Sequence, residues 1–317
     1  MLSRTAENLY WTARYLERAD SIVRLLEVAY RISLIPNTKE GYDNEWESIL
    51  STSGIKNEYL SIYKEIKKEK IEFFLLFDDR NFSSVKNCIT NARENIKMVR
   101  TAVTLEVWNA VNSFFYNYYD LTKKKYYSKD LPEIIDLVKR NVNLIKGTII
   151  NTQLLNDGFD FLILGNYFER ADFTARIIDV KYFILLPSTS LIGTQIDNFQ
   201  WSLMLRSVSS YRAFKWAYGN SEIDYIKIID FLILNNKCPR SLFFSVEKIS
   251  YHLKSLKKHY KENKNFPSKI ENLFRRLKKL TVNDILDEGL HEFLTTFIED
   301  ISAVYSDLEN KYFLGSK

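Results

Sequence analysis

The spacing of apolar residues along the chain predicts an almost entirely helical protein. Between residues 4 and 32 the apolar and small positions recur with the 3.6-residue period of an amphipathic helix, and they form one stripe: Leu9, Thr12, Leu16, Ala19, Val23, Leu26 and Tyr30. The same reasoning predicts helices near 44–52, 56–78, 83–118, 131–151, 159–185, 198–217, 222–234, 240–261, 266–279 and 282–311. No alternating strand pattern of useful length appears, so we expect an all-α fold.

Composition supports this expectation. The 317 residues are 46% apolar, which is enough for a substantial core, yet only 9 are glycine and 5 are proline. All-β folds need many turns, and turns draw on these two residues. We therefore expect long helices joined by few loops, with loops at Ser128–Pro132 and Pro187–Gly193 and a helix end at Gly219.

The sequence repeats itself once. Tyr15–Val28 reads YLERADSIVRLLEV and Tyr167–Val180 reads YFERADFTARIIDV, with seven identities in fourteen positions at an offset of 152. Weaker matches follow in the same order, among them Ser84 with Ser241. We interpret the chain as a duplication with its seam near residue 150. The prediction is a helical bundle of two tandem related halves, about 1–150 and 151–317, around a pseudo-twofold axis. No linker marks the seam, so residues 1–317 should form a single domain.

Each repeat carries a ladder of charge beside its apolar stripe. Asp20 and Arg24 are four residues apart with the acid first, which is the favourable order on a helix. Glu17 lies one turn before Asp20. The candidate cluster comprises the charged residues of both copies: Arg14, Glu17, Arg18, Asp20, Arg24, Glu169, Arg170, Asp172 and Arg176.

Two roles for this cluster remain open, and both can hold at once. In the structural role, the two ladders pair across the axis as buried ion pairs that set helix register. In the ligand role, the arginine forks bind a carboxylate or phosphate and the acids receive an amine, which would suit an amino acid, a peptide end or a phosphorylated intermediate. Catalysis by these groups alone is less favoured, because an adjacent arginine lowers the pKa of a carboxylate and weakens it as a general base.

Signatures of familiar chemistry are missing from the sequence. No cysteine pair has zinc spacing, and His252 and His259 are too far apart along a helix to share a metal without other elements. No phosphate-binding or dinucleotide-binding glycine loop occurs. We expect no metal and no cofactor. Ser84 and Ser241 are better explained as helix caps than as nucleophiles.

The charge pattern and the longest apolar runs bear on partners and location. Net charge is +5, with basic clusters at Lys64–Lys70, Lys123–Lys125, Lys254–Lys264 and Arg275–Lys279. Solvated helix faces are the commoner explanation for such clusters, so nucleic acid is the least favoured partner. The longest apolar runs fall short of a membrane span and no signal peptide is recognised. We expect a cytoplasmic protein that has no contact with membranes.

Several segments resemble one protein family. They are Leu2-Ser3-Arg4, Asn8–Trp11, Arg14–Ala19, Ala92–Asn95 with Val99-Arg100, Tyr167–Asp172, Leu205–Ser207 and Pro239–Ser241. Together they resemble the Alpha-E family, which is named for its helical character and its Glu-Arg motif. The resemblance extends over nearly the whole chain, although Lys97 stands where arginine is expected. It adds secondary site candidates: Arg93, Glu94, Asn95, Arg100, Arg206 and Arg240.

The resemblance implies a function and partners. Members of this family accompany ATP-grasp ligases and transglutaminase-like proteins, so the resemblance implies a helical binding or accessory protein of a bacterial peptide synthesis or modification system. One alternative is an enzyme of peptide metabolism that uses the duplicated Glu-Arg clusters. A second alternative is an RNA-binding helical protein.

Overall fold

A computed structural model describes residues 1–33, 42–123, 125–184, 195–219, 223–261 and 268–314. Across these ranges the regular elements are all helical, which confirms the all-α prediction. The α-helices are α1 (Ser3–Ser33), α2 (Tyr42–Thr52), α3 (Lys56–Tyr63), α4 (Lys68–Leu76), α5 (Val85–Met98), α6 (Leu105–Thr122), α7 (Leu131–Thr152), α8 (Asp157–Ile184), α9 (Gln195–Ser207), α10 (Tyr211–Tyr218), α11 (Tyr225–Ile229), α12 (Leu242–His259), α13 (Ser268–Lys279), α14 (Val282–Glu288) and α15 (Leu290–Leu308). Short 3₁₀ turns lie at Arg100–Ala102 and Ser128–Asp130, and π-helical turns at Asp230–Leu234 and Glu309–Phe313.

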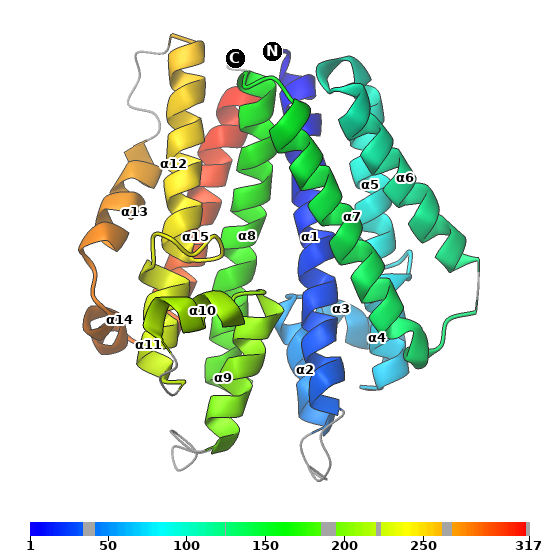
Figure 1. Ribbon diagram of the computed structural model, residues 1–317, viewed down its shortest axis with the longest axis vertical. Coiled ribbons are helices and arrows are strands. Elements are labelled where there is room, and N and C mark those ends of the chain that lie inside the picture. Colours follow the sequence, from blue (N-terminus) through cyan, green and yellow to red (C-terminus); the bar gives the residue numbers. More distant parts are fainter. Residues whose placement is uncertain (34–41, 124, 185–194, 220–222, 262–267, 315–317) are drawn as a thin grey trace.

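Helices α1 and α8 form the centre of the molecule. They lie side by side and run in the same direction (Figure 1). Their backbones approach closely at Gly165, where a Cβ atom would lie 2.1 Å from the carbonyl oxygen of Tyr10 and 3.2 Å from Cβ of Ala13. Only glycine fits at this contact, so Gly165 fixes how closely the two helices pack.

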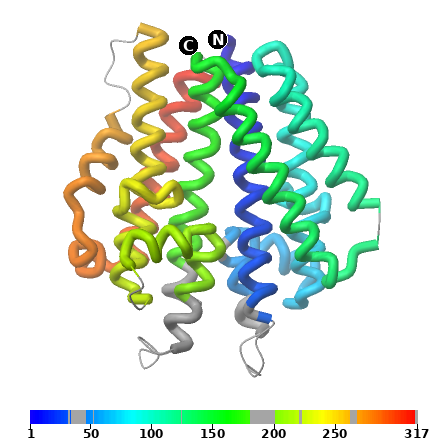
Figure 2. The backbone as a smooth tube through the Cα atoms, viewed as in Figure 1, coloured from blue at the N-terminus to red at the C-terminus, as the bar shows by residue number. Residues whose placement is uncertain are grey.

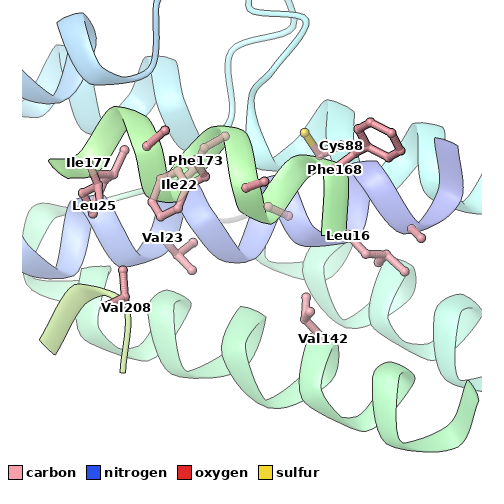
Figure 3. Packing of buried hydrophobic residues seen from close by; sticks show 14 of the residues in the cluster. Leu16, Ile22, Val23, Leu25, Cys88, Val142, Phe168, Phe173, Ile177 and Val208 are labelled. Atoms are coloured by element: carbon pink, nitrogen blue, oxygen red, sulfur yellow. The ribbon is translucent and has the colours of Figure 1, made fainter. Parts of the chain in front are cut away.

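The remaining helices surround this central pair. Helices α5 and α7 pack against α1, and α12 and α15 pack against α8 (Figure 2). The buried side chains between them form a continuous core, to which α1 contributes Leu16, Ile22 and Val23 and α8 contributes Phe168 and Phe173 (Figure 3). Five of the charged motif residues are buried beside this core, and the other four are partly exposed; the buried ones are Glu17, Asp20, Arg24, Glu169 and Arg170.

Several predicted helices are interrupted, and local backbone chemistry explains the breaks. The predicted helix 83–118 splits into α5 and α6, because the Thr104 side chain caps α6 by accepting from the amide of Val107 at 3.3 Å. Predicted helix 56–78 is broken where Lys64 adopts a left-handed conformation, and 198–217 where Ser209 does so. Predicted helix 282–311 is broken at Gly289, whose φ is +95°.

The predictions about helix ends have mixed outcomes. Ser84 and Ser241 are confirmed as N-caps: their hydroxyls accept from the amides of Asn87 and Phe244, at 3.2 and 3.0 Å. Gly219 does end α10. The predicted loop Ser128–Pro132 is wrong, since a 3₁₀ turn leads directly into α7 with Pro132 in its first turn, where its missing N–H is not needed. The predicted loop Pro187–Gly193 lies outside the described residues.

Candidate functional site

The two Glu-Arg motifs exchange partners between α1 and α8. Glu17 accepts hydrogen bonds from Nε and Nη2 of Arg170, at 2.9 and 3.2 Å. Glu169 accepts from Nε and Nη2 of Arg18, at 2.6 and 3.0 Å. Each acid is thus held in the same two-pronged way by the arginine of the other motif. The two charged ladders therefore lie in contact, as the structural role requires.

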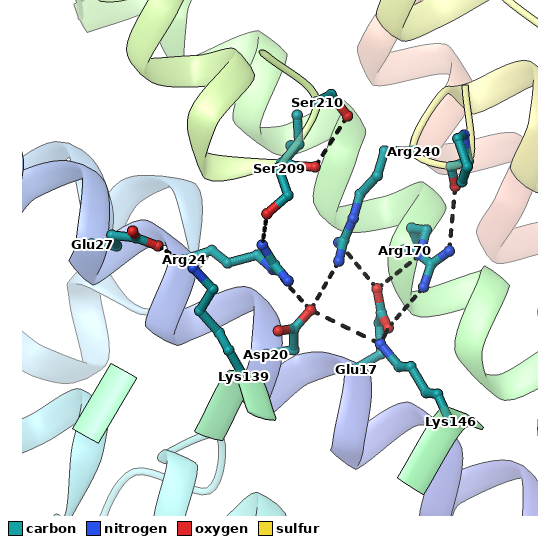
Figure 4. Close-up of polar contacts among 12 residues, drawn as sticks. Glu17, Asp20, Arg24, Glu27, Lys139, Lys146, Arg170, Ser209, Ser210 and Arg240 are labelled. Carbon is teal, nitrogen blue, oxygen red and sulfur yellow. Dashed lines mark hydrogen bonds and ion pairs between the residues drawn. The ribbon is translucent and has the colours of Figure 1, made fainter. Parts of the chain in front are cut away.

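Additional cations converge on the first motif (Figure 4). Arg240, which immediately precedes the N-cap of α12, donates to Glu17 at 3.2 Å and to Asp20 at 2.9 Å. Lys146 of α7 forms an ion pair with Glu17, and Arg24 binds Asp20 through Nε at 2.8 Å. Four cationic side chains therefore surround two carboxylates.

Because the cluster is buried, the pKa of each charged group depends strongly on its oppositely charged neighbours. Glu17 and Asp20 are both 0% exposed. Burial alone would raise the pKa of Glu17, but Arg170, Lys146 and Arg240 outweigh it and hold that pKa well below its ordinary value. Conversely, burial lowers the pKa of Lys146, against the pull of Glu17 and Asp20. The glutamate is ionised and fully engaged, so it is a poor general base.

The second motif has its own set of partners. Arg14 adds a second guanidinium to Glu169, with Nε at 2.8 Å and Nη2 at 2.7 Å from Oε2. Burial would raise the pKa of Glu169, but Arg18 and Arg14 lower it to about 2. Asp172 binds Arg176 through two hydrogen bonds, at 2.8 and 3.1 Å. Three arginines face two carboxylates here, which leaves one positive charge in excess.

A pocket of about 300 Å³ opens beside the second motif. Its walls come from α1, α8, the α2–α3 turn and the segment before α5. The lining residues are Arg18, Ser21, Ile22, Leu25, Ser53, Gly54, Ile55, Ser83, Glu169, Asp172, Phe173 and Arg176. We call it the Arg18–Arg176 pocket. A smaller pocket of about 140 Å³ lies between α1, α7 and α8, near Lys146 and Arg170, and its wall is mostly apolar.

The secondary candidates separate into one member of the cluster and five outlying residues. Only Arg240 reaches the motifs. Arg93 binds Asn112 at 2.8 Å and Glu94 at 2.8 Å on the surface of α5, where Asn95 also lies. Arg100 and Arg206 are exposed and stack on neighbouring rings, at 5.3 Å from Trp108 and 4.2 Å from Tyr211.

Sequence reasoning missed Lys146 and the pocket. Lys146 lies four residues after Val142 and next to Ile145, on the flank of the buried stripe of α7. A charged residue beside these buried apolar positions was the feature from which a buried ion pair of Lys146 could have been predicted. The turn that contributes Ser53 and Gly54 carries no signature, because its place against α8 is set by tertiary packing.

Comparisons with known proteins identify the family. Residues 1–313 match the Alpha-E family, described as "A predicted alpha-helical domain with a conserved ER motif", and the Glu-Arg dipeptide stands in this chain at Glu17-Arg18 and Glu169-Arg170. No curated protein and no solved structure matches. Within the described ranges, no group of acidic, histidine and cysteine side chains could hold a metal ion, and no helix has the length and apolarity to cross a membrane. With its two Glu-Arg pairs joined across the central helices, the chain belongs to the Alpha-E family.

Proposed function

We propose that this protein is a non-catalytic accessory module of a bacterial, cytoplasmic system for peptide synthesis or modification, and that it acts with an ATP-grasp ligase. A transglutaminase-like protein is the second expected partner. The partner class comes from the family resemblance. The accessory role is supported by one observation: the motif glutamates, Glu17 and Glu169, are already bound by arginines of the other motif. Their low pKa values suit a structural brace better than proton transfer.

The proposal includes an internal duplication. Two tandem related halves, about 1–150 and 151–317, would form a single domain around a pseudo-twofold axis. The exchange of arginines between Glu17 and Glu169 supports this arrangement, because a twofold axis would generate the second contact from the first. The equivalent capping roles of Ser84 and Ser241, at the starts of α5 and α12, support it as well.

The test is reconstitution with the ligase. The tagged full-length protein and an ATP-grasp ligase of the same bacterium would be mixed, and both their association and the ADP released by the ligase would be measured. We expect a complex at micromolar concentrations and a change in ligase turnover. Full ligase activity without the protein, together with no association at those concentrations, would contradict the proposal.

An enzymatic role is the second candidate, and one observation favours it. Burial lowers the pKa of Lys146, and a lysine with a lowered pKa can act as a base or nucleophile. Turnover of peptide substrates by the isolated protein, lost in Lys146→Met but kept in Lys139→Met, would support this role. Lys139 is the matched control because it also pairs with a glutamate of α1, Glu27, at 2.7 Å.

A further inference from the structure

We infer that the Arg18–Arg176 pocket is a binding site for a small organic carboxylate with an apolar side chain. This inference goes beyond the accessory role, because it concerns the isolated protein and needs no ligase. The pocket volume, about 300 Å³, lies at the lower end of the range for small-molecule sites.

Each of the two arginines of the pocket has a nitrogen donor that makes no hydrogen bond to the described residues. Arg18 and Arg176 each bind their carboxylates through Nε and Nη2. Neither Nη1 atom has a hydrogen-bond acceptor among the described residues. The Nη1 atom of Arg176 lies beside Gly54, at 3.7 Å from where a Cβ would stand, so it is at the pocket wall. The guanidinium edge of Arg176 is therefore placed to bind a further anion, and Arg18, which lines the same pocket, has one more donor nitrogen without an acceptor.

An independent observation comes from Ser21, which also lines the pocket. Its side chain is buried, at 2% exposure, and its hydroxyl has no hydrogen-bond partner within the described structure. A buried hydroxyl without a partner costs free energy, and a bound ligand would supply the missing hydrogen bond. Ser83 contributes another hydroxyl-bearing side chain to the wall.

The charge around the pocket selects the kind of anion. Arg14, Arg18 and Arg176 face Glu169 and Asp172, so one positive charge is uncompensated. A carboxylate, with its single negative charge, matches this excess. A phosphate monoester carries about 1.5 to 2 negative charges at neutral pH and would leave a surplus beside two carboxylates.

The apolar part of the wall defines the rest of the ligand. Ile22 and Leu25 of α1 lie close to Phe173 of α8 (Figure 3). All three line the pocket together with the charged residues. Ile55 completes this surface from the α2–α3 turn. A branched aliphatic side chain would bury its surface here while the carboxylate binds the arginines.

The experiment is a titration of the full-length protein with N-acetyl-leucine, followed by ligand-observed NMR. We expect saturable binding at millimolar concentrations or below, and none with N-acetyl-leucinamide, which lacks the charge. Arg176→Gln should weaken binding by about tenfold or more, and Ser21→Ala by about threefold to tenfold. Equal binding of the acid and the amide, or tighter binding of isopentyl phosphate than of the acid, would overturn the assignment.

Two matched variants control for changes in stability. Thr174→Val also removes a buried hydroxyl without a partner, but Thr174 is not part of the pocket wall. Arg140→Gln breaks a surface pair with Asp136 that has the same four-residue spacing as the Asp172–Arg176 pair. Both should bind N-acetyl-leucine like the unmodified protein. If either control weakens binding as much as its partner variant does, the pocket is not the site.

Discussion

Replacing Glu17 by glutamine tests whether the first motif is a buried electrostatic brace. Glutamine keeps the shape of the side chain but removes its charge. Arg24, Lys146 and Arg240 would then share Asp20 as a partner. Arg170 would lose the carboxylate with which it forms its ion pair. Removing one partner of a buried ion pair costs about 3–5 kcal/mol. Three cations lose a partner at once here, so we expect a loss in the free energy of unfolding at the upper end, about 5 kcal/mol.

Urea denaturation followed by circular dichroism measures this loss. Glu94→Gln is the matched control, because the Glu94 side chain is 50% exposed while it pairs with Arg93 and Lys97. It should change the free energy of unfolding by less than about 0.5 kcal/mol.

A second variant keeps the test decisive if Glu17→Gln does not fold. Adding Arg240→Gln removes one of the cations left unpaired, so the double variant should recover about 1–2 kcal/mol relative to Glu17→Gln. A loss below about 1 kcal/mol in Glu17→Gln, or further destabilisation by Arg240→Gln, would refute the brace.

Three other predictions follow from named contacts. The folded-state pKa of Glu169 is lowered from 4.5 to about 2, so its contribution to stability is present above pH 4.5 and is lost as the pH falls toward 2. The difference in free energy of unfolding between the unmodified protein and Glu169→Gln should therefore shrink by about 3 kcal/mol over that interval. A constant difference in urea titrations would contradict this. Gly165→Ala should destabilise the protein by about 2–3 kcal/mol, because the added Cβ would overlap the carbonyl oxygen of Tyr10. Gly147→Ala in α7, whose Cβ would have nothing within 4 Å, should be neutral or stabilise the protein by up to about 1 kcal/mol. Equal thermal midpoints for the two variants would show the close contact to be unimportant. Ser241→Ala removes the N-cap of α12 and should cost about 1 kcal/mol in urea denaturation, while Ser241→Asn, which can also cap, should cost little; similar losses in both would exclude capping as the cause.

The sequence predicted much of the helical fold, because helical periodicity is a local property. The stripe that includes Leu9, Leu16 and Val23 is buried as expected, and it faces the centre of the molecule. The contact between the two Glu-Arg motifs was one of the two roles that the sequence left open, since similar segments with complementary charges can pair. Helix breaks were less predictable. Lys64 and Ser209 adopt left-handed conformations, which lysine and serine do not predict.

Long-range partners were the part that the sequence did not specify. Arg240 was a candidate by resemblance and binds Glu17, yet Arg206, proposed on the same grounds, is exposed and stacks on Tyr211. Lys146 contacts Glu17, 129 positions away, because α7 packs against α1. The residues around Lys146 do not predict which acid it pairs with. The pocket has the same origin, because its turn residues and its arginines come together only in the packed molecule.

The reciprocal glutamate–arginine contacts also have a kinetic consequence. Glu17 and Arg170 are separated by 153 positions, and Arg18 and Glu169 by 151, so the first motif of an emerging chain has no counterpart until α8 has been synthesised. Contacts between such distant positions require costly loop closure and slow folding. A nascent fragment that ends before α8 should therefore remain open and accessible to protease, and it should become resistant only when the missing portion is supplied in trans.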